Sequence, residues 1–311
     1  MKLAFVFPGQ GSQANGMLAD LAQAHPTIAS TFAEASEVLG FDLWALVQSD
    51  DNQQLSQTAI TQPALLASSV AIWRAWREAG HAMPALLAGH SLGEYSALVC
   101  ADALDFRDAI DLVRKRGEFM QSAVPAGSGA MAAILGLDDD VVVAACDDVD
   151  TGVVAAVNFN APGQVVIAGD KSAVDAAIER CKAAGARRAL PLPVSVPSHC
   201  ALMEPAAEKL AETLAAVAIK RPSIPVINNV DVQIEQSPEA IQQALVRQLH
   251  SPVRWVESMR EMGRQDVDTI FECGPGKVLC GLHKRIDRKV KTAPLETAEN
   301  FVAAAALITD A

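Results

Sequence analysis

The residue of this sequence best suited to nucleophilic chemistry is a serine between two glycines. Residues 89–93 read Gly-His-Ser-Leu-Gly, which places Ser91 at the centre of a GxSxG pattern. An apolar run at residues 85–88 has the length of a buried parallel strand, and apolar residues at helical spacing follow the pattern. In such a nucleophile elbow, a sharp turn between strand and helix lifts the serine hydroxyl clear of the sheet. The segment predicts that Ser91 is a nucleophile.

A serine hydroxyl becomes a good nucleophile only when a base removes its proton, and the chain has six histidines that could do so. His199 is the preferred candidate because it follows Ser91 in chain order and lies where a domain boundary meets a predicted helix start. His90 adjoins the serine but lies on the opposite side of the turn, so we expect it to pack. The others are expected on the surface, His25, His81 and His283, or in a turn, His250. No acid between Ser91 and His199 is an obvious third member of a triad.

A cation is predicted on the apolar face of the helix at residues 105–122. At a hundred degrees per residue, Arg116 falls in the same sector as Phe106 and Val113. A buried guanidinium must be paired, because an unpaired buried charge is costly. Two partners remain open: a carboxylate of the chain itself, or a substrate carboxylate held in a bidentate fork.

Two glycine-rich segments resemble phosphate-binding loops without meeting their requirements. Residues 9–14 fit a loose GxGxxA pattern, but Gly16 interrupts the helix that should follow, and residues 27–39 are predicted to be helical where a second strand is required. Residues 274–277 are no P-loop, because Val278 stands in place of the required serine or threonine. Neither segment therefore predicts nucleotide chemistry.

Strands alternating with helices around these residues predict an α/β fold with a hydrolase-like large domain built on a parallel sheet. The large domain is expected at residues 1–125 and 198–311. Between them, residues 126–197 predict the order β-α-β-β-α-β of an inserted ferredoxin-like domain, with residues 158–164 as the linker between its central strands. A long helix is expected from Ser198, as its N-cap, to residue 216.

Composition limits the partners and the location. The net charge of −12 argues against nucleic acid as a partner, so an anionic ligand requires a local basic patch. No apolar run approaches the length of a membrane span, and we expect a cytoplasmic protein. The six cysteines form no CxxC pair, so neither a zinc site nor another metal site nor disulfides are expected.

Several spaced motifs resemble one family across nearly the whole chain. The strings are FVFPGQGSQ, TQPALL, AGHSLGEYSAL, RGEFMQ, VNFNAPGQVVIAG, PVSVPSHCALM and ECGPGKVLCGL. Together they resemble the malonyl-CoA:acyl-carrier-protein transacylases of fatty acid synthesis, with no departure at a motif position. The set is far more specific than GxSxG alone.

The resemblance implies a role for each candidate residue. Ser91 is acylated, His199 is the general base and Arg116 holds the malonyl carboxylate. Gln10 and Leu92 supply the backbone N–H groups of an oxyanion hole, and the main-chain carbonyl of Gln248 orients the histidine in place of an acid. Malonyl-CoA is then the donor, an acyl carrier protein the acceptor, and no cofactor or metal is needed.

The sequence also suggests where the carrier protein docks, and it leaves two other functions open. Because acyl carrier proteins are acidic, we expect them to dock on a basic cluster formed by Lys284, Arg285 and Arg188, and we expect a monomer. A serine esterase or thioesterase would use the same Ser91 and His199 with water as acceptor. A catalytically silent carrier-binding module is the third possibility, which the intact motif set disfavours.

Overall fold

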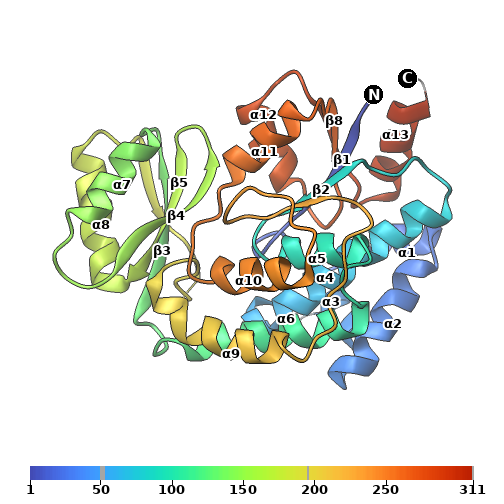
Figure 1. Cartoon of the computed structure of the whole chain (residues 1–311), viewed down its shortest axis with the longest axis horizontal. Helices are drawn as coiled ribbons and strands as arrows, with labels where there is room; N and C mark the ends of the chain where they lie inside the picture. The colour runs from blue at the N-terminus through green and yellow to red at the C-terminus, as the bar shows by residue number, and fades with distance from the viewer. Residues whose placement is uncertain (50–52, 195, 310–311) are drawn as a thin grey trace.

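The structure is a computed structural model that describes residues 1–49, 53–194 and 196–309. The described residues do not include 50–52, 195, 310 and 311, all of which fall inside the predicted domain ranges. Residue 195 is Ser195 of the PVSVPSHCALM motif. The described chain forms two separate sheets with helices packed on them, and the smaller sheet lies at the left of Figure 1. The fold is therefore α/β, as the sequence predicts.

The larger sheet is entirely parallel. Among the described residues it has five strands in the order β7-β2-β1-β8-β9. The strands are β1 Leu3–Phe7, β2 Leu86–Gly89, β7 Val226–Ile227, β8 Thr269–Glu272 and β9 Lys291–Pro294. Every residue of β1, β2 and β8 is buried, which explains why these segments read as continuous apolar runs.

Two hydrophobic clusters cover the two faces of this sheet. Leu3, Phe5 and Phe7 of β1 point into the larger cluster, whereas Ala4 and Val6 point into the other. The helices and helical turns around the parallel sheet are α1 Ala19–Ala24, α2 Thr27–Leu39, α3 Leu43–Gln48, η1 Gln54–Ser56, α4 Thr58–Glu78, α5 Gly93–Cys100, α6 Phe106–Ser122, η2 Ala201–Met203, α9 Glu204–Leu214, α10 Pro238–Gln248, α11 Trp255–Arg264, α12 Val278–Ile286 and α13 Ala298–Thr309. In Figure 1, α11 and α12 lie to the left of β8 and β1, and α4, α5 and α6 lie below these strands.

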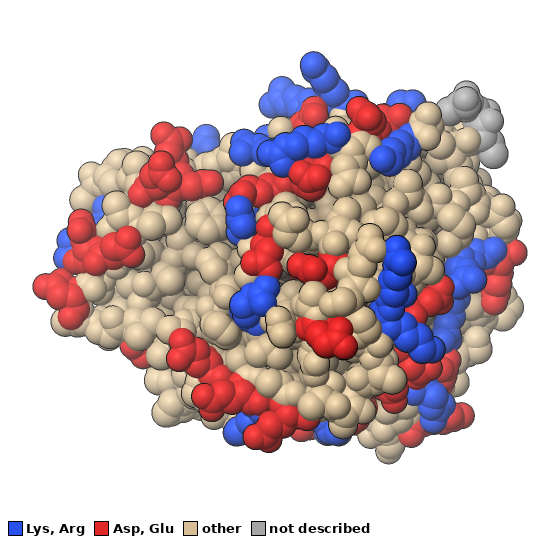
Figure 2. All heavy atoms as spheres, viewed as in Figure 1, with Lys and Arg blue, Asp and Glu red and all other residues tan. Residues whose placement is uncertain are grey.

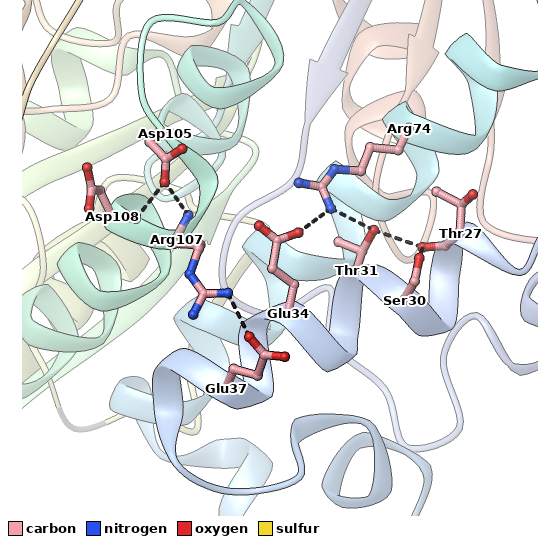
Figure 3. Close-up of polar contacts among 9 residues, drawn as sticks. All are labelled: Thr27, Ser30, Thr31, Glu34, Glu37, Arg74, Asp105, Arg107 and Asp108. Atoms are coloured by element: carbon pink, nitrogen blue, oxygen red, sulfur yellow. Dashed lines mark hydrogen bonds and ion pairs between the residues drawn. The ribbon is translucent and has the colours of Figure 1, made fainter.

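Polar contacts fix the outer helix α2 against its neighbours (Figure 3). Arg74 of α4 donates hydrogen bonds to Glu34, at 2.7 Å, and to Thr31, at 3.2 Å. Arg107 of α6 pairs with Glu37 at 2.8 Å. Asp105 caps α6 by accepting from two backbone N–H groups, as expected for a helix predicted to start there.

The smaller sheet is antiparallel, with the strand order β4-β5-β3-β6. Its elements follow one another as β3 Gly129–Leu135, α7 Asp139–Asp147, β4 Val154–Ala161, β5 Gln164–Asp170, α8 Lys171–Ala183 and β6 Arg188–Pro191. Both helices pack on one face, and Cys200 and Leu202 of the returning chain contact a second cluster on this sheet.

Backbone hydrogen bonds join the small sheet to the rest of the molecule. The N–H of Phe159 donates to the carbonyl of Val253 at 3.1 Å, and the N–H of Val253 donates to Val157 at 2.8 Å. Arg285 of α12 also donates to Pro162 and Gln164 at the turn between β4 and β5. The seam between the two sheets is therefore bonded through both main chain and side chains.

Two expectations about local structure are wrong. The linker predicted at residues 158–164 is a tight turn, since β4 runs to Ala161 and β5 begins at Gln164. Register shifts within β4 break the alternation that a regular strand shows in sequence. The long helix predicted from Ser198 begins only at Glu204, because His199 has a φ of 67°, which no right-handed helix accommodates.

The burial of the cysteines and of His283, and the character of the helices, also bear on the expectations from the sequence. All six cysteines are free thiols and buried. No helix within the described residues combines the length and apolar character needed to cross a membrane. His283, expected on the surface, is only 2% exposed, because α12 turns its ring toward α11.

Candidate active site

Ser91 lies in the sharp turn between β2 and α5. Its φ of 51° is in the left-handed region, which a non-glycine residue adopts only where the surroundings enforce it. The two glycines of the motif make the turn possible: a Cβ at Gly89 would lie 1.8 Å from the carbonyl carbon of Gly93, and one at Gly93 would lie 2.0 Å from the carbonyl oxygen of Phe7. The spacing GxSxG is thus a steric requirement of the turn.

His199 is far from Ser91 in the sequence but contacts it in the structure. Its Nε2 lies 2.8 Å from the Ser91 Oγ, and its Nδ1 lies 2.7 Å from the main-chain oxygen of Gln248. A carbonyl oxygen only accepts, so Nδ1 carries the proton and the lone pair of Nε2 faces the hydroxyl. The N–H of His199 donates to Leu249 at 2.9 Å, which holds the strained backbone in place. The arrangement suits general-base chemistry.

The surroundings keep this imidazole neutral. Burial and the nearby Arg116 charge lower the pKa of His199 to about 3. A group with that pKa is unprotonated at neutral pH, so its lone pair is free to accept the serine proton.

Arg116 points at the same hydroxyl and has no carboxylate partner among the described residues. One guanidinium nitrogen donates to Gln62 at 2.9 Å, and the other donates to Gln248 at 3.1 Å and to the Ser91 Oγ at 3.3 Å. Its Nε has no partner within the described chain, and the side chain is 1% exposed. Burial lowers its pKa. Of the two alternatives left open by the sequence, the ion pair with a carboxylate of the chain itself is not found within the described residues.

A cavity of about 360 Å³ opens over these groups. It is bordered by Ser91, Leu92, Arg116 and His199 and by residues of the small sheet such as Met131. It therefore lies between the two sheets, with the hydroxyl, the imidazole and the guanidinium facing one space.

Gln10 and Leu92 also line this cavity. Within the described residues, neither of their backbone N–H groups has an acceptor, whereas the N–H of Ser91 donates to Asn229 Oδ1 at 2.7 Å. Leu92 directly precedes α5, so its N–H lies at the positive end of the helix dipole. Two free donors near the hydroxyl are what a developing oxyanion requires.

Three polar residues of the site were not singled out from the sequence. Gln62 holds Arg116, Asn229 holds the backbone of Ser91, and Glu94 accepts hydrogen bonds from Gln248 and Asn229. Gln62 falls inside the quoted motif TQPALL and Glu94 inside AGHSLGEYSAL, which are the signals that could have found them. The side chain of Gln248 was missed as well, because only its carbonyl was assigned a role.

The remaining candidates do not contact the hydroxyl, although His90 lines the same cavity. His90 is paired through Nε2 with Asn160 of β4 at 2.8 Å, consistent with a packing residue. Lys284, Arg285 and Arg188 do not line the cavity. Within the described chain, no group of three metal-ligating side chains is found.

Comparison with known proteins agrees with this geometry. The family model described as acyl transferase domain matches residues 4–298. The malonyl CoA-acyl carrier protein transacylase of Escherichia coli (strain K12) is 60% identical over 286 residues, covering 92% of this chain and 93% of that protein. The protein of the same name from Bacillus subtilis (strain 168) is 47% identical over 302 residues, covering 96% of this chain and 95% of that protein.

Solved structures give the same result. A chain from the complex of a type II PKS acyl-carrier protein with its malonyl-transacylase has a TM-score of 0.98 and 58% identity, covering 99% of this chain and 100% of that chain. An acyl carrier protein S-malonyltransferase from Vibrio cholerae has a TM-score of 0.96 and 60% identity, covering 97% of this chain and 99% of that chain. The chain therefore belongs to the acyl transferase domain family and, within it, to the malonyl CoA-acyl carrier protein transacylases.

Proposed function

We propose that this enzyme transfers the malonyl group of malonyl-CoA to the phosphopantetheine thiol of an acyl carrier protein through a malonyl ester on Ser91. The observation that carries the proposal is Arg116, a buried cation without a carboxylate partner among the described residues, 3.3 Å from the nucleophile. In malonyl-CoA a carboxylate and a reactive thioester are attached to one methylene. A single bound molecule can therefore pair with Arg116 and react with Ser91.

In the first step, His199 Nε2 takes the proton of Ser91 as Oγ attacks the thioester carbon. The backbone N–H groups of Gln10 and Leu92 then hold the oxyanion, at about 3 kcal/mol for each donor. Collapse of the intermediate breaks the carbon–sulfur bond, and coenzyme A leaves with the proton returned by His199. The carbonyl of Gln248 keeps the proton of the histidine on Nδ1 throughout.

The second step repeats the first with another thiol. His199 removes the proton of the carrier's thiol, the sulfur attacks the serine ester, and Ser91 leaves as an alkoxide that recovers that proton. A thioester is exchanged for a thioester, so the chemistry requires no cofactor beyond the substrates themselves.

The fold assignment that goes with this function is also a proposal. We assign the turn at Ser91 to a hydrolase-like nucleophile elbow, supported by the left-handed serine between β2 and α5. We assign residues 126–197 to a ferredoxin-like domain inserted between residues 1–125 and 198–311. Its element order and its sheet order β4-β5-β3-β6 support that assignment.

The covalent intermediate provides the direct test. Incubation with malonyl-CoA is expected to add the mass of one malonyl group to the intact protein, and Ser91→Ala is expected to abolish this gain. Addition of a carrier protein with its phosphopantetheine arm should remove the adduct and transfer it to the carrier. Steady release of free malonate without a carrier would instead indicate a thioesterase, and absence of any adduct would indicate a silent binding module.

Carrier docking is proposed at the basic side chains over α12. Figure 2 shows Lys and Arg gathered at the upper edge, where α11 and α12 lie. Lys284 and Arg285 lie in the last turn of α12. Arg285 donates hydrogen bonds to Gln164 and Pro162 at the turn between β4 and β5, and Arg188 begins β6 of the same small sheet. An acidic carrier would be steered to this surface.

Charge reversal tests the docking surface. Lys284→Glu with Arg285→Glu is expected to raise the KM for the carrier roughly tenfold, because each reversal replaces attraction by repulsion at the rim. The KM for malonyl-CoA should stay unchanged. Lys209→Glu, which reverses one exposed charge on α9 at the opposite edge of the molecule, is the matched control for Lys284→Glu alone. An equal effect of the control would show that only net charge matters.

We further propose that the enzyme works as a monomer in the cytoplasm. Six buried and unbridged cysteines support this location, because unpaired thiols are the rule in reducing compartments.

A further inference from the structure

A buried carboxylate lies directly behind the proposed nucleophile and has no part in the steps above. Glu94 is in the first turn of α5, three residues after Ser91, and is 3% exposed. Its Oε2 accepts two hydrogen bonds, one from the side chain of Gln248 at 2.8 Å and one from the backbone N–H of Asn229 at 2.9 Å. Within the described chain, it forms no ion pair. A buried acid held only by neutral donors is costly, so its presence calls for an explanation.

The partner of Glu94 is the residue that connects all parts of the site. The main-chain oxygen of Gln248 accepts from His199, its Oε1 accepts from Arg116, and its Nε2 donates to the carbonyl of Ser91 at 3.1 Å. Gln248 is the last residue of α10 and fully buried. The imidazole is therefore held by the main chain of this residue and the guanidinium by its side-chain amide.

A glutamine amide can be turned over to exchange its oxygen and nitrogen, and the carboxylate decides between the two orientations. Glu94 only accepts when ionised, so it requires Nε2 on its own side and thereby places Oε1 toward Arg116. The reversed amide would set two oxygens against each other at Glu94 and two donors against each other at Arg116. Asn229, held by the same Oε2, accepts from the N–H of Ser91 through its own side chain.

The charges around Glu94 agree with this arrangement. Burial raises the pKa of Glu94 to about 7, while the hydrogen bonds from Gln248 and Asn229 and the charge of Arg116 lower it. At neutral pH Glu94 is therefore about half ionised, and the amide of Gln248 lies between this buried acid and the buried Arg116 cation.

We propose that Glu94 is a positioning residue that acts through Gln248: it holds the side-chain amide in one orientation, so that Oε1 fixes Arg116 for the malonyl carboxylate, and it anchors the residue whose main-chain oxygen orients His199. This inference rests on the proposed function. In place of the acid of a catalytic triad, which would contact the histidine directly, the carboxylate acts one residue away.

The test compares Glu94→Met, which fills a similar volume without an acceptor, with Glu94→Gln, whose carbonyl can accept the same two hydrogen bonds. Glu94→Met is expected to lower kcat/KM for malonyl-CoA about ten- to hundredfold, as for loss of hydrogen bonds to a charged group. It should lower the rate with acetyl-CoA less, because only the malonyl group has a carboxylate for Arg116 to pair with. Glu94→Gln should restore the rate and the preference to within about threefold.

A double-mutant cycle separates positioning from stability. In a Gln248→Met background, Glu94→Met should have no further effect on the rate, since the amide through which it acts is gone. Additive losses, or equal losses with malonyl-CoA and acetyl-CoA, would overturn the proposal, as would an unchanged rate in Glu94→Met. If Glu94→Met does not fold, Glu94→Ala takes its place in the cycle.

Two further measurements complete the design. Ser96→Ala is the control in the same helix, because the buried Ser96 hydroxyl has no partner among the described residues, and it should leave the rate unchanged. The burst of p-nitrophenol released from p-nitrophenyl acetate measures the acylation of Ser91 with His199 as base, without malonyl-CoA. A wild-type protein that gives this burst but forms no malonyl adduct would refute the proposed function. A slower burst in Glu94→Met than in the wild-type protein would still support the positioning role of Glu94, and an unchanged burst would count against it.

Discussion

His199→Ala is expected to lower kcat/KM for malonyl-CoA by about a thousandfold or more, because the proton of Ser91 then has no acceptor within reach. The His199 Nε2 lies 2.8 Å from Oγ, and the adjacent His90 is engaged with Asn160 instead. The measurement is the pre-steady-state release of coenzyme A. A loss smaller than tenfold would show that another group serves as base.

The pH dependence of the wild-type enzyme tests the same assignment independently. Burial and Arg116 lower the pKa of His199 to about 3, and the active form is the neutral one. Acylation of Ser91 should therefore persist as the pH falls from 7 to 5, instead of declining through the usual histidine range near about 6.5. Glu94 has a pKa of about 7 and titrates in the same range, so a decline near that value that persists in Glu94→Gln would show that the imidazole is solvated in the working enzyme.

Arg116→Ala is expected to lower kcat/KM for malonyl-CoA by about a hundredfold or more, as for truncation of one partner of a buried charge pair. The rate with acetyl-CoA should fall much less, since the acetyl group has no carboxylate to pair. Some loss is expected with both donors because the guanidinium also donates to the Ser91 Oγ at 3.3 Å. The malonyl-to-acetyl ratio of kcat/KM is therefore the quantity to measure.

Arg116→Lys is the control for this prediction. Lysine keeps the charge but cannot contact Gln62, Gln248 and a carboxylate at once with a planar fork, so an intermediate ratio is expected. An unchanged ratio in Arg116→Ala would mean that the arginine only supports the packing of Gln62 and Gln248.

The surroundings of Ser91 could be predicted because the constraints on that turn are local. The two glycines, the apolar strand and the following helix lie within a few residues, and the steric reason for each glycine depends on its immediate neighbours. The burial of Arg116 was likewise readable, because the angular position of a side chain on a helix follows from spacing alone.

The surroundings of His199 could not be predicted in the same way. The sequence after it has a helical pattern, so a helix was expected to start at Ser198. The left-handed backbone of His199 depends instead on the carbonyl of Leu249, which is far away in the chain. Contacts of this kind leave no periodic signal.

Gln62, Asn229 and Glu94 were missed for a related reason. Each acts through hydrogen bonds to residues on other elements, and no spacing within the chain reveals such pairs. The same holds for β4, whose shifts in register hide its full length.

The burial of every cysteine has a consequence for an enzyme that handles free thiols in each turnover. Burial raises the pKa of Cys100 and Cys273 well above the usual value, so neither is present as a thiolate at neutral pH. Mixed disulfides form by attack of a thiolate on an accessible sulfur. Oxidised coenzyme A and oxidised carrier arms are therefore expected to form mixed disulfides with these buried cysteines only slowly.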